Sequence, residues 1–488
     1  VRLMRCVVAG SGITGLTAAL LLARQGHTVT VVEAAARVAP LLRGFWREGL
    51  YFDTGFHCGG GLHVGGVLRR WLRALGVERH LQQVTTRRTE VFHFADGQVY
   101  CLPAGHGAVT EAVERQFPGS GVPMAAFLRH MDAELGHSPY LNPAVRAEPE
   151  FALNSAGSVA QYTASAGFPP HLQAMLGTRC LLYGVCPEES SLEEYSLVAG
   201  PYFQSSGSWQ GGGLALVEAL VGCLDDLGVT IRCNTSVTGI DADKAHGVRG
   251  VVLGDGSRLD CDRCFFTGHP AQLEGLIPPG LVRPAYLHRI NELPETRPAM
   301  LLFAETRDCL DENESTYLLP EPSAQELFPG VESPQPSVYL FCDRPQADGR
   351  KAVMAVALMD GNDLPAGNPH PRPGNYAQWK RGATARLQAY IEQRLPELVG
   401  RWRILDAASP LTMRHWVYGA TGSLYGVKHH LGAMPMLPVT RLPGLFLAGQ
   451  NILLPGVLGG MVSAALAVGF SFGHDNVLKE FRECAEDG

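Results

Sequence analysis

The sequence predicts an α/β protein, in which a discontinuous domain with a parallel sheet carries an inserted α+β domain. Residues 5–33 contain a short apolar strand, a glycine-rich turn, a helix and a second strand, the order of a Rossmann-like βαβ unit. Helices that begin after glycines are predicted again much later, after Gly211 and after Gly456. The segments between these helices do not have the βαβ pattern. We therefore expect residues 1–75, 205–285 and 405–488 to form the first domain, and residues 76–204 and 286–404 to form the second.

The first turn has the residues that a bound dinucleotide requires. It consists of Gly10, Ser11, Gly12, Ile13, Thr14 and Gly15. Gly10 permits the sharp turn, Gly12 lets the backbone approach a pyrophosphate, and Gly15 lets the helix pack close to the strand. The helix that begins near Ile13 offers free N–H groups and a positive dipole end to the phosphates. Glu33, at the tip of the second strand, is placed to accept hydrogen bonds from ribose hydroxyls.

The position of this motif indicates which dinucleotide binds. It stands at the start of the chain, and no second Gly-x-Gly-x-x-Gly occurs in the sequence. FAD binds in an extended form and needs contacts from distant segments, so an N-terminal site with later supporting segments favours FAD. The first domain is therefore predicted to be a Rossmann-like FAD-binding domain.

The composition is that of a globular protein. The 488 residues are 46% apolar and 18% charged, with a formal net charge of −7 and an isoelectric point near 6.2. This balance excludes nucleic acid as a partner. Because the N-terminus runs directly into the first strand, we expect no export segment, a cytoplasmic location and reduced cysteines. We expect the CxxC at Cys261 and Cys264 to hold core or surface thiols rather than zinc or redox chemistry.

Residues 442–473 contain no charged residue and are long enough to cross a bilayer. Pro443, Pro455 and several glycines interrupt them, so we predict a buried strand, a turn and a buried helix. Peripheral attachment to a membrane stays open.

Residues 47–55 predict a hairpin that returns toward the nucleotide. The glycines of residues 55–61 allow the backbone to approach a flat ligand closely. His57 stands within this run, and two interpretations are open. It is either a loop histidine bonded to the backbone or a polar group beside the redox ring.

These segments resemble a known superfamily. The first motif, Arg37 and residues 48–55 are similar to the flavin-containing amine oxidases and phytoene desaturases. Residues 55–77 resemble the carotenoid isomerase and retinol saturase branch, which has an Asp-x-Gly-x-His sequence at this place. The resemblance implies that Arg43 occupies the family's arginine position beside the flavin. Most members carry Gly-Gly where Ala39-Pro40 stands here, so we expect the loop of residues 38–44 to differ.

Residues 75–206 have the pattern of short amphipathic helices with few strand signals, including residues 124–135 and 160–182. As a block, this region is expected to form a substrate cap. Residues 285–405 predict an antiparallel sheet with covering helices. Its expected elements are strands at 299–304, 337–342 and 352–359 and a helix at 378–395. The long loops at 307–335 and 343–373 are candidates to cover a tunnel or contact a membrane.

Between these regions, residues 215–226 predict a helix, residues 229–233 a strand and residues 248–259 a hairpin with Asp255-Gly256 at its turn. The resemblance implies that the strand is the third of the nucleotide sheet and that the backbone at Val237 meets the adenine. It also implies that the chain passes back near the cofactor at Gly268. We interpret His269 as a turn residue rather than a catalyst.

The closing segment offers a second helix start. A strand ends at Gly449-Gln450, and Gly459-Gly460-Met461 lies at the start of an Ala- and Val-rich helix. Such a helix end would stabilise negative charge on a reduced flavin ring. In the resemblance, this is where the flavin O2 edge lies. Gln450 in place of the usual acid, and Tyr425 and His429 in a Tyr-Gly-x-x-His sequence, are similar to retinol saturases.

We therefore expect an FAD-dependent oxidoreductase that acts on a carbon–carbon bond of an apolar polyene or isoprenoid, by desaturation, saturation or isomerisation. His57, Tyr425 and His429 are the candidate polar groups near the ring. We expect no metal site at His429-His430, because no third ligand stands at a suitable spacing. The absence of a second nucleotide motif favours desaturation or isomerisation, while NADPH as a transient donor stays open.

Two alternatives remain at this point. One is a flavin amine oxidase, with Trp416 and Tyr418 as candidates for the aromatic pair beside the amine. The other is a non-catalytic flavin-binding scaffold whose altered loop at residues 38–44 no longer supports turnover. The sequence does not reveal the oligomeric state.

Overall fold

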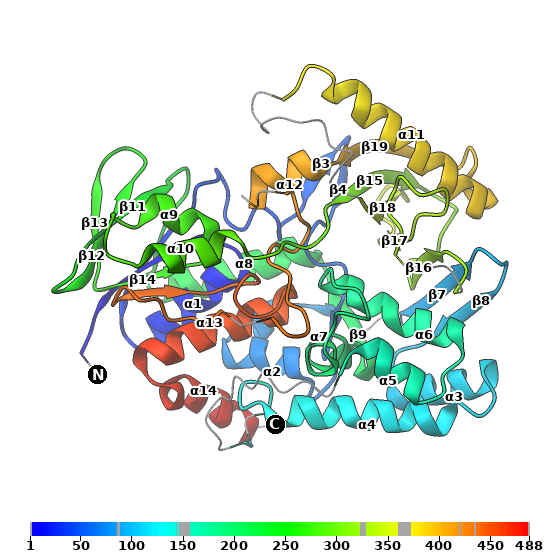
Figure 1. Cartoon of the computed structure of the whole chain (residues 1–488), viewed down its shortest axis with the longest axis horizontal. Coiled ribbons are helices and arrows are strands. Elements are labelled where there is room, and N and C mark those ends of the chain that lie inside the picture. Colours follow the sequence, from blue (N-terminus) through cyan, green and yellow to red (C-terminus); the bar gives the residue numbers. More distant parts are fainter. Residues whose placement is uncertain are drawn as a thin grey trace.

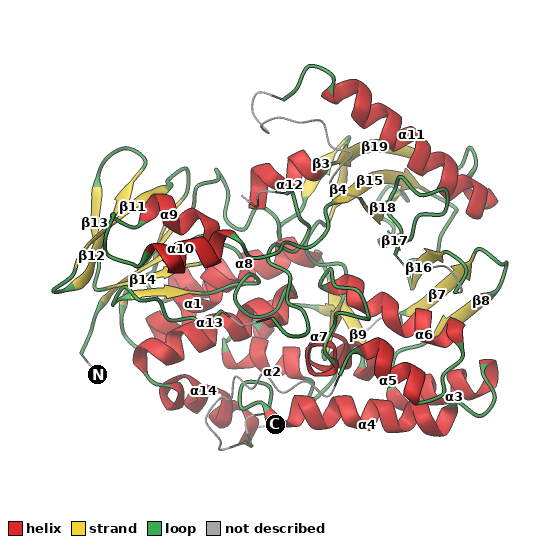
Figure 2. Ribbon diagram, in the orientation of Figure 1, coloured by secondary structure: helices red, strands yellow, loops and turns green. Residues whose placement is uncertain are grey.

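The computed structural model of the chain describes residues 2–84, 88–142, 144–145, 157–322, 328–359, 372–417, 419, 421–433 and 436–486. A parallel sheet and its helices occupy one side of the molecule, and a larger mixed sheet lies on the other (Figure 1). A group of helices lies below the mixed sheet in the same view, and few strands are found there (Figure 2).

Five parallel strands form the first sheet, in the order β10-β2-β1-β14-β20. They are β1 (Arg5–Ala9), β2 (Thr28–Val32), β10 (Thr230–Arg232), β14 (Arg263–Phe266) and β20 (Leu445–Leu447). Most of their residues are apolar, as strands covered on both faces require. The carboxyl ends of β1, β14 and β20 meet at one edge, although these strands come from the start, middle and end of the chain.

Alternate residues of β1 point to opposite faces of this sheet. Cys6 and Val8 share a core to which five helices contribute most of the residues, whereas Val7 and Ala9 share one with a small antiparallel sheet. The helices are α1 (Ile13–Arg24), α2 (Val67–Ala74), α8 (Gly212–Asp226), α13 (Gly456–Phe472) and α14 (His474–Glu486). The small sheet consists of β11 (Val237–Asp243), β12 (Gly247–Leu253) and β13 (Arg258–Asp260), near α9 (Leu273–Leu276) and α10 (Pro284–Asn291).

The second large sheet has seven strands in the order β19-β15-β18-β17-β16-β7-β8. They are β7 (Thr89–Phe94), β8 (Val99–Leu102), β15 (Ala299–Thr306), β16 (Glu314–Leu319), β17 (Val338–Cys342), β18 (Lys351–Leu358) and β19 (Trp402–Ala408). One face packs against α11 (Tyr376–Arg394). The hairpin of β3 (Phe45–Arg47) and β4 (Leu50–Phe52) packs on the sheet near β15 and β18, and α12 (Pro410–Val417) follows β19.

The inserted helices share a core with β7, β8 and β16. They are α3 (His106–Gln116), α4 (Gly121–His137), α5 (Val159–Ser165), α6 (Pro170–Gly177) and α7 (Leu192–Gln204). A short ladder of β5 (Gly59–Gly60), β9 (Ser206–Trp209) and β6 (Gln83–Val84) ties this region to the glycine-rich segment that contains His57.

Most of the predicted elements are observed. The βαβ unit, the third strand β10, the hairpins at residues 47–55 and 248–259, and the strand and buried helix at residues 442–473 are all present. Among the described residues, no helix combines the length and apolarity needed to span a bilayer. Cys261 and Cys264 are both buried, free thiols.

Three expectations about the inserted regions were wrong. Residues 75–206 contain β7 and β8, which join the mixed sheet. Residues 160–182 do not form continuous helix, because Pro169 and Pro170 separate α5 from α6, and a 3₁₀ segment (Thr178–Leu182) follows. The mixed sheet is not wholly antiparallel, since β16 pairs with β7 in parallel.

Candidate active site

The glycine turn after β1 has the geometry expected of a phosphate cradle. Gly10 adopts a φ of +107°, and a Cβ on Gly15 would overlap the Gly10 carbonyl, so both positions require glycine. A Cβ on Gly12 would meet no atom within 4 Å, which leaves space above the turn. No side chain caps α1, so its first N–H groups are available to an anion.

Glu33 lies beside this turn and is buried. Its Oε2 accepts hydrogen bonds from the Ser11 N–H at 2.9 Å and the Ser11 hydroxyl at 2.6 Å, and its Oε1 accepts from the Ala35 N–H at 2.8 Å. The Thr235 N–H donates to the Glu33 carbonyl at 2.8 Å, two residues before Val237 at the start of β11. The structure thus places Glu33 and the segment before Val237 side by side.

The loop of residues 38–44 keeps a conformation that favours glycine. Ala39 adopts a φ of +49° and is buried, and its N–H donates to the Ser11 hydroxyl at 2.9 Å. The left-handed region favours glycine, so a glycine at position 39 would be unstrained. The Arg43 carbonyl accepts a hydrogen bond from the Tyr51 hydroxyl at 2.9 Å. The loop is therefore tied to both the turn and the β3-β4 hairpin.

Asp53 caps a helix that lies far away in the sequence. Its carboxylate accepts hydrogen bonds from Gly213 in the first turn of α8 at 2.6 Å and from Phe56 at 3.0 Å. Burial raises the pKa of Asp53 to about 6, although these backbone donors lower it. Burial and the charge of Asp53 raise the pKa of Asp343 to about 7. The Asp-x-Gly-x-His motif is thus anchored to α8 through its first residue.

The helix start at α13 packs directly on the start of α1. A Cβ on Gly460 would stand 2.7 Å from the Ile13 Cγ2, so only glycine permits this approach. Met461 is fully buried, and the Gly449 N–H donates to Ser463 on α13 at 2.8 Å. No side chain caps α13 either, so two uncapped helix starts lie next to each other.

The segment of residues 425–429 is fastened to the end of β20. The His429 Nε2–H donates to the Gln450 carbonyl at 2.6 Å, and the Val427 N–H donates to Asn451 Oδ1 at 2.9 Å. The Tyr425 N–H donates to Thr296 at 3.1 Å. Burial lowers the pKa of His429, which favours the neutral ring. His429 therefore supports the backbone at Gln450 rather than lining open space.

Gly268 and His269 follow β14 at the same edge. The preceding Thr267 hydroxyl donates to the Ala9 carbonyl at 2.9 Å, which joins the ends of β14 and β1. His269 Nδ1 accepts from the Ala271 N–H at 3.3 Å, and its Nε2 lies 3.3 Å from Glu295. This geometry agrees with the interpretation of His269 as a turn residue.

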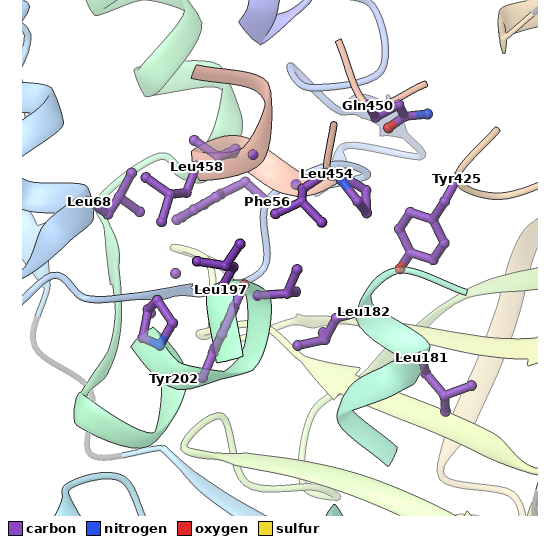
Figure 3. Close-up of a pocket in the computed structure, with 18 of the residues that line it drawn as sticks. Phe56, Leu68, Leu181, Leu182, Leu197, Tyr202, Tyr425, Gln450, Leu454 and Leu458 are labelled. Carbon is purple, nitrogen blue, oxygen red and sulfur yellow. The ribbon is translucent and has the colours of Figure 1, made fainter. Parts of the chain in front are cut away.

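A cavity of about 890 Å³ lies between these segments, the inserted helices and the mixed sheet. Its walls come from residues 54–60, from residues 453–459, from α4 and α7, and from the mixed sheet. Figure 3 shows that Leu68 and Leu458 lie on one side, Phe56 and Leu197 in the middle, and Tyr425 and Leu181 on the other. The walls are predominantly apolar, as sites for apolar ligands are.

The cavity brings together two of the three expected polar groups. His57 and Tyr425 line it, whereas His429 lies behind Gln450. The His57 ring contacts the Phe341 ring at 4.7 Å between centroids, and burial lowers the pKa of His57 to about 3. Burial raises the pKa of Tyr425 to about 12. Both side chains are therefore uncharged at neutral pH.

A buried ion pair behind the wall was not anticipated from the sequence. Arg179 donates to the Glu90 carboxylate at 2.6 Å, the Tyr317 hydroxyl donates to Glu90 at 3.2 Å, and Tyr317 lines the cavity. The Arg179 guanidinium also lies over the Phe203 ring, 3.9 Å from its centroid. The placement of Glu90 and two phenylalanines at every second position of β7 is a pattern that indicates a strand. Residues 75–206 were nevertheless interpreted as mostly helical.

The residues present fit a bound flavin dinucleotide. Open space above Gly12, uncapped starts of α1 and α13, and Glu33 beside the turn suit the nucleotide and pyrophosphate, and the glycines of residues 55–61 border the apolar cavity. Fold and site define a flavin-dependent oxidoreductase. The chain belongs to the family of flavin containing amine oxidoreductases, whose model matches residues 13–468.

Individual relatives refine this assignment. The chain is 24% identical to the all-trans-retinol 13,14-reductase of Homo sapiens, over 94% of this chain and 84% of the relative. It is 26% identical to a phytoene desaturase of Cercospora nicotianae, over 52% of this chain and 44% of the relative. The fold is similar to that of an oxidoreductase from Methanosarcina mazei, with a TM-score of 0.64, 15% identity, and 94% and 99% of the two chains covered.

Proposed function

We propose that this enzyme desaturates, saturates or isomerises a carbon–carbon bond of an apolar polyene or isoprenoid. The observation that carries the proposal is the cavity of about 890 Å³, whose mainly apolar walls extend from residues 54–60 and 453–459 to the mixed sheet. The names of the retinol reductase and phytoene desaturase relatives support the same bond type. The bound flavin supplies the hydride chemistry, which no amino-acid side chain can perform.

In this proposal the cofactor-binding residues are those of the converging loops. Gly10 to Gly15 hold the pyrophosphate, Glu33 the ribose and the backbone of Val237 the adenine. Arg43 and Gly268 lie along the cofactor. The residues at its ring end are Gly449, Gln450, Gly459, Gly460 and Met461. The uncapped start of α13 supports this placement, because its positive dipole end stabilises negative charge.

The chain's own contribution is to orient the substrate and exclude water. Apolar side chains such as Leu197 and Leu454 hold an apolar chain without offering it charge. His57 and Tyr425 are the candidate catalytic groups, because they are the expected polar side chains that line the cavity. His429 is a positioning residue, since its Nε2–H donates to the backbone of Gln450.

Filling the cavity tests the proposal. Leu197→Trp is expected to weaken binding of an all-trans polyene by about tenfold or more, because an indole ring occupies the middle of the space. Equilibrium dialysis with the flavin-loaded protein measures the affinity. Leu227→Trp, at an exposed position after α8, is the matched control and should leave affinity unchanged. Equal affinity of both variants for the polyene would contradict the proposal.

Substitutions of His57, Tyr425 and His429 are expected to affect different measurable properties. His57→Ala and Tyr425→Phe are each expected to slow flavin reduction or reoxidation by about tenfold or more, because each removes a polar contact from the cavity. His429→Ala is expected instead to loosen the Gln450 backbone and lower flavin retention. Stopped-flow absorbance gives the rates, and the ratio of flavin to protein gives the retention. Unchanged rates in both cavity variants would remove these residues from the mechanism.

The rival functions have distinct outcomes. Trp416 is 41% exposed and is not among the cavity-lining residues, and Tyr418 lies outside the described residues. Peroxide release from amines in air would nevertheless replace the present proposal with amine oxidation. A flavin that dithionite reduces but no organic substrate reduces or reoxidises would indicate a scaffold.

The electron partner and the location are part of the proposal. Anaerobic addition of NADPH bleaches the oxidised flavin if the enzyme is a nicotinamide-fed reductase. An unchanged spectrum favours a desaturase that passes electrons to another acceptor, or a redox-neutral isomerase. We place the enzyme in the cytoplasm or peripherally at a membrane, which supplies apolar substrates, and sedimentation with liposomes tests the second location.

A further inference from the structure

The charged side chains in the cavity wall are all acidic or imidazole groups. Glu134 on α4 and Glu193 on α7 line the cavity, together with His57 and His137. Among the described residues that line it, there is no lysine or arginine. Among the described lining residues, a ligand therefore meets two carboxylates and no permanently positive side chain, and the nearby His130 Nε2 lies 4.0 Å from Glu134.

The nearest arginines behind the wall are already engaged. Arg179 is paired with Glu90 at 2.6 Å. Arg88 donates to the backbone carbonyls of residues 312 and 342 at 2.7 and 3.0 Å, and Arg70 donates to that of Leu141 at 2.7 Å. Glu90 balances the charge of Arg179, and the hydrogen bonds of Arg88 and Arg70 to backbone oxygens use N–H groups that could otherwise donate to an anion inside the cavity.

The histidines do not replace the missing cation. Burial lowers the pKa of His57 to about 3, so its ring is neutral at pH values where a fatty acid is ionised. His137 is the last residue of α4 and is exposed, where water and salt screen any charge that it carries. A carboxylate that enters the cavity would lose its hydration without gaining a cationic partner among the described lining residues.

We infer that the cavity selects an uncharged polyene or isoprenoid against one that ends in a carboxylate, and that Glu134 and Glu193 are the specificity-determining residues. The inference rests on the proposed function, which places such a chain in this cavity. An anion pays for desolvation in apolar surroundings and is repelled by the two glutamates. An alcohol or ester avoids both costs, and a hydroxyl can donate a hydrogen bond to a glutamate.

A matched pair of ligands tests the selection. One polyene chain is prepared as its free acid and as its methyl ester, which differ in charge but little in shape. Equilibrium dialysis with the flavin-loaded protein at neutral pH measures both affinities. The acid is expected to bind at least about 100-fold more weakly than the ester. An acid that binds within about threefold of the ester would overturn the inference.

Substitution of the two glutamates tests whether they cause the weaker binding of the acid. The double variant Glu134→Gln/Glu193→Gln is expected to tighten binding of the acid by about tenfold, because the repulsion is lost, with the ester unchanged. Glu218→Gln, at an exposed position of α8 outside the cavity, is the control for net charge and should change neither affinity. Unaltered binding of the acid by the double variant would overturn the role of Glu134 and Glu193.

Dialysis combined with a turnover assay separates this inference from the proposed function. Dialysis measures occupancy of the cavity and not turnover. An amine of the same chain that is oxidised with peroxide release would end the carbon–carbon proposal, while a rejected acid would still support charge selection. Equal binding of acid and ester, with turnover of a neutral polyene, would end the charge selection alone.

Discussion

Replacing Gly15 by alanine is expected to weaken FAD binding by at least about 100-fold, or roughly 2.7 kcal/mol. A Cβ at this position would overlap the carbonyl oxygen of Gly10, so α1 has to move away from β1. The movement displaces Gly10 and Gly12 together with the first N–H groups of α1, which form the phosphate cradle. The ratio of flavin absorbance to protein absorbance in the purified protein, followed by a titration with FAD, measures the loss.

Gly222→Ala provides the matched control for this change. Gly222 also lies within a helix, α8, but a Cβ there would meet no atom within 4 Å. This substitution is expected to retain full flavin occupancy and to stabilise the helix by about 0.5–1 kcal/mol. Full flavin occupancy in the Gly15 variant as well would show that the close contact between α1 and β1 does not shape the cradle.

Breaking the buried ion pair behind the cavity is expected to cost about 3–5 kcal/mol of folding free energy. Arg179→Met removes the partner of Glu90, whose carboxylate then keeps the Tyr317 hydroxyl as its one side-chain donor among the described residues. The side chains of Arg179 and Glu90 are only 4% and 15% exposed, so water cannot replace the lost partner. Urea unfolding of the flavin-loaded protein measures the free energy, and flavin content checks the native state.

The double variant Arg179→Met/Glu90→Gln separates the pair energy from the cost of an orphaned charge. Glutamine removes the charge but can still accept the hydrogen bond from Tyr317. The double variant is expected to regain most of the stability lost in Arg179→Met, because an uncharged pair requires no counter-ion. A double variant that is as unstable as the single one would attribute the loss to packing of the guanidinium on Phe203.

The elements that the sequence predicted well are those with strong local signals. The turn at Gly10–Gly15 combines steric needs that only glycine meets, and Asp255-Gly256 specifies a hairpin turn. The elements that it predicted poorly depend on distant partners. β7 (TEVFHF) has as many polar as apolar residues, and it joins the other strands of the mixed sheet because β16, far along the chain, pairs with it in parallel.

Some residues of the candidate site could likewise be predicted from local signals, and others could not. The glycine motifs and Glu33 could be assigned from the sequence, because each contributes through its own backbone or its place at a strand end. His429 was grouped with His57, yet it contacts the Gln450 backbone behind the cavity. Its role depends on how the segment of residues 425–429 folds over the end of β20, which no local pattern specifies.

The sequence by itself determined the class of this protein: a βαβ unit for a dinucleotide and later glycine-led segments that support a flavin. These features follow from residues close together in the chain, where sterics and hydrophobic periodicity act locally. Only the tertiary structure decided that Asp53 caps α8, that Arg179 neutralises Glu90, and that two glutamates but no lysine or arginine face the cavity among the described residues. Charge pairing and burial depend on which distant segments meet, and that meeting exists only in the folded chain.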